Sequence, residues 1–423
     1  MAVEKIFDIT IFGATGFTGK FVFLEAVKSG ALKKYSIAVG GRNKEKLEKV
    51  VKDIEHETGT AAKCGYIVAD VKNTESLEEM ARQSKLVINC VGPYRFFGEP
   101  VVNACVKHAC HHIDISGEPQ YLERMQLEYN ALAKEKEIYV VGACGFDSIP
   151  ADMGVVYLSK KFEGELNSVE VYLSSQAPKG SSFHYATWQS AIYGFAHANE
   201  LKPLRRKLYP ERLPEFKPKL KTRSVIHYSP LVKKYCLPFP GSDRSVVNRS
   251  QRHFFENRRQ RPVQMLAYVA QESILTTIGT IFVAAMFGLL ASFRFGRSLL
   301  EKYPRFFSLG AFSHEGPTRE EMDAMSFEMV FHGRGWQEKT AEPTDQHVEK
   351  PDKTLDVKVF GPEPGYYTCS ITALQSAITV LEEKEKMPNG GGVFPPGAAF
   401  ADTSLIDRLE ANGLHFEVIK ARL

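Results

Sequence analysis

The amino-acid sequence predicts an α/β protein: an N-terminal doubly wound parallel sheet followed by a second, mixed α+β domain. In residues 1–150, short apolar segments typical of buried strands alternate with segments typical of helices. After Pro150 this pattern changes. The chain of 423 residues is long enough for two or three domains. We therefore expect a first domain over residues 1–150 and a second, for substrate binding or interaction, over residues 151–389.

The segment IFDITIFGATGFTGK predicts a buried strand, a glycine turn and the start of a helix. Gly13 allows the tight turn, Gly16 lets the backbone approach a pyrophosphate at the helix N-terminus, and Gly19 lets helix and strand pack closely. Thr15 and Phe17 lie in the same turn and belong to the predicted site. This order of elements predicts a Rossmann dinucleotide-binding domain. The alternative is a structural turn in an α/β protein that binds no nucleotide.

The second predicted strand, YSIAVGGR, ends near Arg42. Dinucleotide-binding folds that prefer NAD carry an acidic residue here, which binds the ribose 2′-hydroxyl group. This chain has Arg42, Asn43 and Lys44 instead, and two cations without a carboxylate suit a 2′-phosphate. The sequence therefore predicts NADP(H) as the cofactor. Alternatively, Arg42 is a solvated residue at a helix start, or it stacks on the adenine.

The remaining elements of the first domain continue the alternation. The third strand, GYIVAD, ends at Asp70, which would border the adenine. The fourth, KLVINCVGP, carries Asn89 and Gly92, which would border the nicotinamide ribose. Helices are expected at SLEEMARQS, EPVVNACVKHA and YLERMQLEYNALAKEK, and strands at HHIDIS and IYVVGAC. Strands that alternate with helices in this way predict a parallel sheet.

Several motifs together give the chain a family resemblance, and they are GATGFTG, NCVGPYRFFGEPVVNAC, HHIDISGE, GFDSIPADMG, GPEPGYY and GGVFPPGAAF. The sequence resembles the saccharopine dehydrogenase-like oxidoreductases over nearly its full length. The resemblance implies a Rossmann domain, a second mixed domain and a C-terminal segment, residues 390–423, that returns to the first domain. It also implies association of animal members with membranes or lipid droplets, and kinship with a bacterial enoyl reductase that acts on lipid-like chains.

The resemblance also bears on the substrate. Amino-acid-handling saccharopine enzymes have a turn similar to Gly-x-Asp-Pro-Gly, whereas this chain has GFDSIP at residues 145–150, which weighs against an amino-acid substrate. By resemblance, residues 181–198 enter the substrate region. The side chains that would line it are His184, Tyr185, Thr187 and Trp188; the alternative is a capped helix with aromatic core residues.

The catalytic proton donor stays unassigned at this stage. Four residues could take this role: Tyr94, Asp147, Tyr157 and His184. Tyr157 and Lys161 form the Tyr-x-x-x-Lys pair of short-chain dehydrogenases, in which the lysine lowers the pKa of the tyrosine. One or two such pairs are expected by chance in a chain with 17 tyrosines.

Composition narrows the functional class and the location. The net charge is +4 and no nucleic-acid motif is present, so we expect no nucleic-acid partner. Seven cysteines without a C-x-x-C pair indicate reduced thiols in an intracellular protein. The N-terminus lacks the pattern of a cleaved signal. Between residues 105 and 112, cysteines and histidines are divided between a helix and a strand, so we expect no metal site.

The segment of residues 273–293, SILTTIGTIFVAAMFGLLASF, is long and apolar enough to cross a bilayer. Basic residues flank both of its ends, contrary to the positive-inside rule, and a crossing would separate the C-terminal segment from the first domain. We favour insertion into one leaflet or a droplet; the alternatives are burial in a core or dimer interface, or a true span. The proline-rich segment 202–223, with nine basic residues, is expected to be an extended loop that meets anionic headgroups or is a solvated linker.

These observations predict an NADP(H)-dependent oxidoreductase that transfers hydride to or from a hydrophobic, lipid-like substrate at a membrane or lipid-droplet surface. The expected location is the lipid droplet, with the endoplasmic reticulum or the mitochondrion as alternatives, and a homodimer is also allowed. Two other functions stay open. One is a non-enzymatic membrane- or droplet-associated protein with a vestigial dinucleotide site. The other is an amino-acid-linked dehydrogenase of the saccharopine type.

Overall fold

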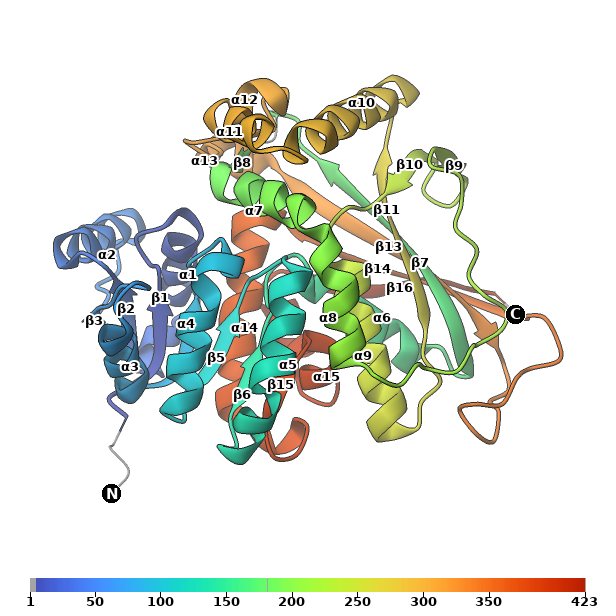
Figure 1. Cartoon of the computed structure of the whole chain (residues 1–423), viewed down its shortest axis with the longest axis horizontal. Coiled ribbons are helices and arrows are strands. Elements are labelled where there is room, and N and C mark those ends of the chain that lie inside the picture. Colours follow the sequence, from blue (N-terminus) through green and yellow to red (C-terminus); the bar gives the residue numbers. More distant parts are fainter. Residues whose placement is uncertain (1–4, 181, 423) are drawn as a thin grey trace.

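The computed structural model describes residues 5–180 and 182–422 and contains two seven-stranded sheets (Figure 1). The first sheet is parallel throughout, in the order β15-β6-β5-β4-β1-β2-β3. Its strands are β1 (Phe7–Phe12), β2 (Ile37–Gly41), β3 (Gly65–Val68), β4 (Ser84–Asn89), β5 (His111–Asp114), β6 (Tyr139–Val141) and β15 (Gly392–Phe394). The order of β1 to β6 is that of a Rossmann domain, as predicted.

Helices cover both faces of this sheet. One face packs against α1 (Phe17–Lys28), α2 (Lys44–Thr58) and α14 (Cys369–Glu382). The other packs against α3 (Thr74–Gln83) and α4 (Tyr94–Lys107), with α5 (Pro119–Glu135) beside α4. Because both faces are covered, most residues of the central strands β1 and β4 are buried, and their buried residues include the apolar Ile9, Ile11, Leu86, Val87 and Ile88.

The second sheet is mixed, in the order β16-β14-β13-β7-β11-β10-β9. Only β7 and β11 run parallel to each other. Its strands are β7 (Glu165–Gln176), β9 (His227–Ser229), β10 (Lys234–Pro238), β11 (Gln264–Gln271), β13 (Ser326–Trp336), β14 (Lys353–Pro362) and β16 (His415–Arg422). It packs against α6 (Ile149–Lys161) and α9 (Asp243–Arg258), so the predicted fold class is confirmed.

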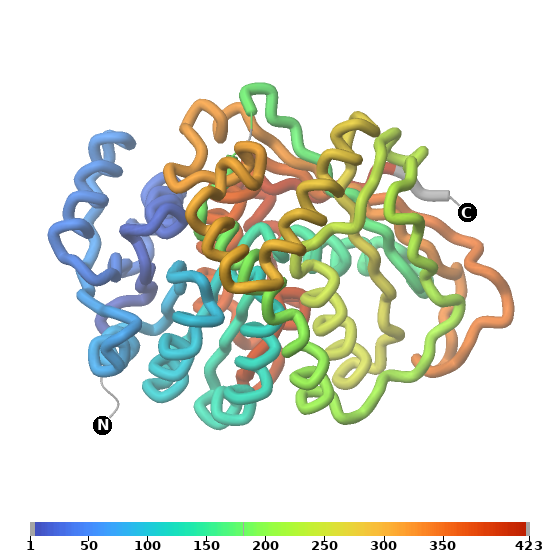
Figure 2. Tube along the Cα trace, turned by 45° about the horizontal axis from the view of Figure 1, so that its top comes forward, coloured from blue at the N-terminus to red at the C-terminus, as the bar shows by residue number. Residues whose placement is uncertain are grey.

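The C-terminal part of the chain contributes to both sheets. β15 extends the first sheet beside β6, with Val393 opposite Val140, whereas β16 pairs with β14 at the edge of the second sheet. α14 already packs against α1 and β4, so the return to the first domain begins before residue 390. Figure 2 shows red segments of the C-terminal part lying beside the cyan elements of the first domain.

The remaining elements complete the fold, and all but the turn at Ala31–Lys33 follow the first domain in the chain. These are β8 (Phe183–His184), α7 (Tyr185–Ala196), α8 (Leu201–Leu208), α10 (Ile274–Ala291), α11 (Arg294–Lys302), α12 (Pro304–Phe307), β12 (Phe312–Ser313), α13 (Arg319–Ala324), the π-helix η3 (Pro364–Thr368), α15 (Pro396–Phe400) and α16 (Leu405–Ala411), with 3₁₀ turns at Ala31–Lys33, Ala198–Glu200 and Lys384–Lys386. The prediction of an extended loop over 202–223 is wrong for α8. Pro203 lies in the first turn of α8, where its missing N–H group breaks no helical hydrogen bond.

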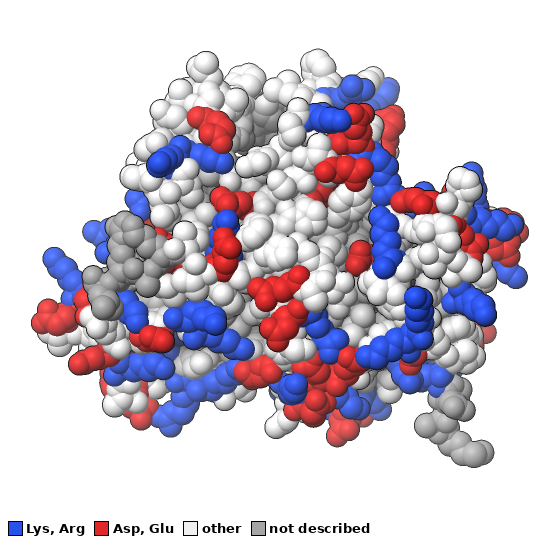
Figure 3. Space-filling model, turned by 180° about the vertical axis from the view of Figure 1, so that it is seen from behind, with Lys and Arg blue, Asp and Glu red and all other residues white. Residues whose placement is uncertain are grey.

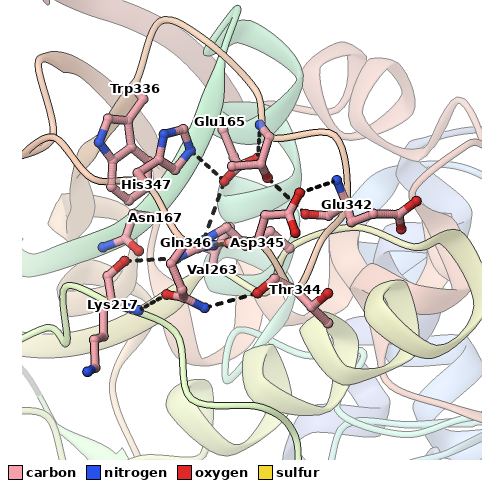
Figure 4. A network of polar contacts seen from close by, with 12 residues as sticks. Glu165, Asn167, Lys217, Val263, Trp336, Glu342, Thr344, Asp345, Gln346 and His347 are labelled. Carbon is pink, nitrogen blue, oxygen red and sulfur yellow. Dashed lines mark hydrogen bonds and ion pairs between the residues drawn. The ribbon is translucent and has the colours of Figure 1, made fainter.

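A polar network pins the loop of residues 337–352 to the second sheet (Figure 4). The carboxylate of Glu165 accepts hydrogen bonds from Thr340 N (3.0 Å) and Thr340 Oγ1 (2.8 Å), and it lies 2.9 Å from His347 Nε2. The His347 ring stacks on Trp336, with 3.7 Å between ring centroids. The loop borders a cavity of about 400 Å³ that is lined from α6, α9 and β7, and not from the glycine turn.

The apolar segment forms α10, and α10 lies on the surface. Of its 18 residues only Thr277 and Ala291 are buried, which excludes burial in the core of this chain. Among the described residues, α10 is the one helix long and apolar enough to cross a membrane. In Figure 1, α10 to α12 lie along the upper rim, with α7 beneath them.

Candidate active site

The glycine turn joins β1 to α1 with little space around it. Gly13 has φ = +89°, and a Cβ atom there would lie 2.8 Å from Val91 Cγ2. A Cβ atom on Gly19 would lie 2.2 Å from the carbonyl oxygen of Gly13. Both positions therefore require glycine. Thr15 and Gly16 are exposed at the start of α1, whose first turn has no acidic residue, so the turn presents backbone N–H groups to an anionic ligand.

The end of β2 lies beside this turn. A Cβ atom on Gly41 would lie 3.6 Å from Thr15 Oγ1, and the next residue, Arg42, is exposed. Asn43 caps α2 by accepting a hydrogen bond from Lys46 N (2.8 Å). With the cap supplied by Asn43, the Arg42 guanidinium is available to a 2′-phosphate.

The predicted nicotinamide side contains an unsatisfied polar group. Asn89, at the end of β4, is buried, and its Oδ1 accepts a hydrogen bond from Val91 N (3.0 Å). Its Nδ2 has no hydrogen-bond partner within the described residues, which makes it a buried donor suited to a polar ligand group. Gly92 directly follows Val91 and adjoins the same turn. Asp70 accepts from Lys72 N (3.0 Å) and so orders the turn after β3.

The second domain closes over the glycine turn through aromatic side chains. The Phe17 ring stacks on His184 (5.2 Å between centroids) and meets Tyr366 edge-on (4.6 Å). His184 N donates a hydrogen bond to the Tyr366 hydroxyl (2.7 Å). A Cβ atom on Gly316 would lie 2.7 Å from the Phe17 ring. Phe17 therefore links the glycine turn to three segments of the second domain.

Of the four proton-donor candidates, His184 contacts the glycine turn. Its Nδ1 accepts a hydrogen bond from Ala186 N (3.2 Å), which places the proton of a neutral ring on Nε2. Burial, and secondarily the neighbouring His314, lower the pKa of His184 below its usual range. The imidazole is therefore neutral at pH 7.

The other three candidates are engaged elsewhere. The Tyr94 hydroxyl donates to the Asn89 carbonyl oxygen (2.8 Å), and burial holds the pKa of Tyr94 well above its usual range. Asp147 accepts from Ser242 N (3.0 Å) and Ser242 Oγ (2.9 Å) at the start of α9. Tyr157 packs on Phe416 of β16, and Lys161 Nζ lies over its ring at 5.5 Å rather than at its hydroxyl. The Tyr-x-x-x-Lys pair thus packs on the second sheet.

Two buried carboxyl groups beside the site were missed at the sequence level. Asp114, opposite Asn89 in the sheet, accepts from Ser116 N (3.0 Å) and the Tyr121 hydroxyl (2.9 Å), and burial raises its pKa to about 6. Glu118 accepts from Tyr94 N (2.8 Å) at the start of α4, and its pKa is raised by burial. An acidic residue at the carboxyl end of a predicted parallel strand, in the motif HHIDISGE, was the available signal.

The cysteines and histidines of residues 105–112 serve the packing of the first domain. Cys105 and Cys110 are buried thiols, His108 Nε2 lies 3.0 Å from Glu78, and His111 Nδ1 accepts from Tyr139 N (3.0 Å). Across the described ranges 5–180 and 182–422, no group of three or more His, Cys, Asp or Glu side chains could hold a metal ion.

The parallel sheet, the glycine turn and the exposed Arg42 define a dinucleotide-dependent oxidoreductase with a Rossmann domain. Residues 9–141 match the family model of the saccharopine dehydrogenase NADP binding domain, so the cofactor is NADP(H). The chain is 44% identical to a human protein named saccharopine dehydrogenase-like oxidoreductase, over 100% of this chain and 99% of the relative. The chain belongs to the family of saccharopine dehydrogenase-like oxidoreductases.

Two further comparisons extend this result. The chain is 37% identical to a Caenorhabditis elegans protein named lipid droplet localized protein, over 97% of this chain and 98% of the relative. The solved structure of saccharopine dehydrogenase (L-Glu forming) from Saccharomyces cerevisiae has a TM-score of 0.55 at 13% identity, covering 98% of this chain and 100% of that chain. The yeast enzyme shares the fold with this chain.

Proposed function

We propose that this NADP(H)-dependent oxidoreductase transfers hydride to or from a hydrophobic, lipid-like substrate that it meets at a membrane or lipid-droplet surface. One observation carries the proposal: a single helix, α7, connects the exposed apolar helix α10 to the glycine turn. At its start, His184 stacks on Phe17 (5.2 Å). Along its length, Trp188 packs on Phe287 of α10 (4.8 Å) and donates from Nε1 to Leu300 O of α11 (2.9 Å).

The name of the nematode relative supports the lipid part of the proposal. That protein is described as localized to lipid droplets, and it aligns with this chain over nearly its full length. We extend that location to this chain, with the endoplasmic reticulum and the mitochondrion as alternatives. An enzyme whose substrate dissolves in lipid gains access to it by working at the lipid surface.

The residues of this chain would act on the reaction through binding and orientation. The bound nicotinamide supplies or accepts the hydride, which is the chemistry of the cofactor. Asn89 Nδ2 would fix a polar group of the nicotinamide or its ribose. Phe17 and Tyr366 would keep water out of the reacting region. The neutral His184 would polarise a substrate carbonyl by hydrogen bonding, because its lowered pKa leaves no imidazolium proton to donate at pH 7.

Two arginines between the domains weigh against an amino-acid substrate, which would need cations for its carboxylates. Arg95 donates to Glu200 (2.8 Å) and to Tyr193 O (2.8 Å). Arg319 Nη2 donates to both carboxylate oxygens of Glu57 (2.9 and 2.8 Å). Both guanidinium groups are therefore already neutralised by this chain.

NADPH oxidation by the full chain in detergent micelles tests the proposal. The lipid substrates are a long-chain 2-enal and a long-chain ketone. The amino-acid alternative is the semialdehyde of an amino acid, offered together with glutamate. We expect turnover with a lipid carbonyl or enoyl substrate and none with the amino-acid pair. NADPH binding without turnover of any lipid substrate would overturn the proposal in favour of a non-enzymatic droplet protein.

A further inference from the structure

We propose that α10, α11 and α12, together with the β9–β10 hairpin, form a docking platform that lies within one leaflet of an anionic phospholipid surface. The proposal rests on the proposed function, because it takes a lipid surface as the place where the enzyme works. It adds the orientation of the molecule, the residues that enter the lipid and the depth to which they enter.

The platform exposes large apolar side chains from separate segments. Leu275 and Phe282 on α10 are 76% and 71% exposed, and Phe306 on α12 is 73% exposed. The surface includes further exposed side chains, namely Val225, Tyr228, Leu231, Ile274, Ile278, Leu289, Phe293, Phe295 and Leu309. Seen from behind, the left and centre of the upper edge are largely free of charged side chains, charged side chains gather at the upper right, and charges of both signs cover the lower half (Figure 3). Soluble proteins rarely expose apolar patches of this extent without a partner.

Basic residues lie among these apolar side chains. α11 and α12 carry Arg294, Arg297, Lys302 and Arg305 against one acidic residue, Glu301. Arg294, Lys302 and Arg305 are exposed, and they follow α10 directly in the chain. An apolar surface with adjacent cations is complementary to acyl chains with anionic headgroups above them.

The chain connections place both ends of α10 on the same folded body. Before α10, β11 is a strand of the second sheet, and Gln271 at its end donates to Thr280 Oγ1 (2.9 Å). After α10, the chain reverses so tightly that a Cβ atom on Gly296 would lie 2.1 Å from Leu290 O. α11 then packs on α7 through the hydrogen bond from Trp188 to Leu300 O. A span would pull one end away from this body, so α10 lies along the surface within one leaflet.

The same cations argue against a second copy of this chain as the partner. A two-fold symmetric dimer places the same patch on both sides of the interface. Arg294, Lys302 and Arg305 would then approach their own copies across an apolar contact with one nearby acidic residue, Glu301. Like charges at such an interface oppose association, whereas anionic headgroups neutralise them.

Vesicle flotation of the full chain tests the platform without any substrate or nucleotide. We expect flotation with phosphatidylcholine vesicles that contain phosphatidylserine. Phe282→Glu and Leu289→Glu should each weaken binding about tenfold or more, because each places a charge where an exposed apolar side chain would enter the lipid. Arg294→Gln and Arg305→Gln should each weaken binding about fivefold, and only when phosphatidylserine is present. The matched control is Val348→Glu, in the loop of residues 337–352, where the side chain is 98% exposed.

Insertion depth separates one leaflet from a span. The two native tryptophans, Trp188 and Trp336, are buried, so Phe282→Trp and Phe306→Trp add reporters on the platform. Lipids brominated near the headgroup should quench both reporters more strongly than lipids brominated at the chain ends. Stronger quenching of Phe282→Trp at the bilayer centre would overturn the proposal in favour of a span.

Two results would contradict the proposal of a docking platform and leave the proposed function unaffected. One is flotation of Phe282→Glu equal to that of the parent chain. The other is no flotation, with a concentration-dependent increase in mass that Phe282→Glu abolishes, which would make this surface a dimer interface. Conversely, flotation with no NADPH-dependent turnover of lipid substrates would overturn the proposed function alone. Each variant must retain its thermal shift with NADPH, which shows that it is folded.

Discussion

Arg319 of α13 and Glu57 of α2 form an ion pair that joins the second domain to the first, with Nη2 of Arg319 2.9 and 2.8 Å from the two carboxylate oxygens. The same guanidinium lies over the Phe21 ring (4.5 Å) and donates from Nη1 to the Tyr367 hydroxyl (3.3 Å). One side chain thus contacts α1, α2 and the π-helix. We infer that the Arg319 side chain helps to hold the second domain closed over the glycine turn.

Replacing Arg319 tests this link. Both partners are about one-third exposed (37% each), so we expect Arg319→Met to lower the free energy of unfolding by only about 0.5–1 kcal/mol. A double-mutant cycle with Glu57→Gln, measured by urea unfolding, isolates the pair. We also expect weaker NADPH binding, because the closed arrangement becomes less populated. Unchanged NADPH affinity in Arg319→Met would show that the pair has no part in closure.

Arg42→Ala is expected to reduce the affinity for NADPH about tenfold or more and to leave the affinity for NADH unchanged. A charge-assisted hydrogen bond to the 2′-phosphate exists only with NADPH, and such a bond contributes about 1.5–3 kcal/mol. Thermal shift and fluorescence titration with both nucleotides measure the change. Lys46→Ala, on the exposed first turn of α2, serves as the control. An equal loss for both nucleotides would indicate that Arg42 contacts the adenine instead.

Gly19→Ala is expected to abolish NADPH binding and to destabilise the first domain by several kcal/mol. The added Cβ atom would lie 2.2 Å from the Gly13 carbonyl oxygen, so α1 must move away from the turn. The control is Gly279→Ala in α10, where a Cβ atom would meet nothing within 4 Å. The control should be neutral or slightly stabilising, because alanine favours helix. Urea unfolding and NADPH titration of both variants give the comparison; a Gly19→Ala protein with parental NADPH affinity would refute the turn geometry.

Asp114→Asn is expected to change how stability depends on pH. Burial raises the pKa of the Asp114 carboxyl from 3.8 to about 6. Between these values the native state holds a proton that the unfolded chain has lost, so the contribution of Asp114 is fully present below about pH 4 and is lost as the pH rises through 6. Relative to the parent, the variant should gain at most about 3 kcal/mol between pH 4 and pH 7.

Urea unfolding at four pH values between 4 and 7 measures this difference. Asp53→Asn, on the exposed face of α2, controls for a general change in charge. A difference between parent and Asp114→Asn that stays constant over this range would show that the carboxyl group titrates alike in the native and unfolded chains.

The first domain was predictable because its signals are local. Strand–helix alternation and the spacing of Gly13, Gly16 and Gly19 specify the sheet and its turn without reference to the rest of the chain. The second domain gives weaker signals. The proline-rich composition of residues 202–223 predicts an extended loop and misses α8, because Pro203 lies in the first turn, where a helix tolerates proline. The Tyr157–Lys161 pair could not be placed from spacing alone, since spacing fixes a helix face but not what that face contacts.

The side chains of the second domain that face the glycine turn could not be predicted from the sequence, and the reason is different. Arg319 and Glu57 are separated by 262 residues, and His184 and Tyr366 by 182. Contacts at such separations leave no periodic pattern in a single sequence. The predicted residues Thr15, Gly16, Arg42, Asn89 and Gly92 all come from the carboxyl ends of neighbouring parallel strands, where a fold rule places them together; no comparable rule exists for the second domain.

The position of β15 in the first sheet has a consequence for synthesis of the chain. Residues 1–141 leave the ribosome with one edge of their sheet, β6, unpaired, and the strand that covers it is made about 250 residues later. Until then the exposed edge can pair with other extended chains. Pairing with β15 removes this exposed edge once residues 392–394 have been made. A chain terminated before residue 392 would carry the glycine turn and keep β6 open permanently.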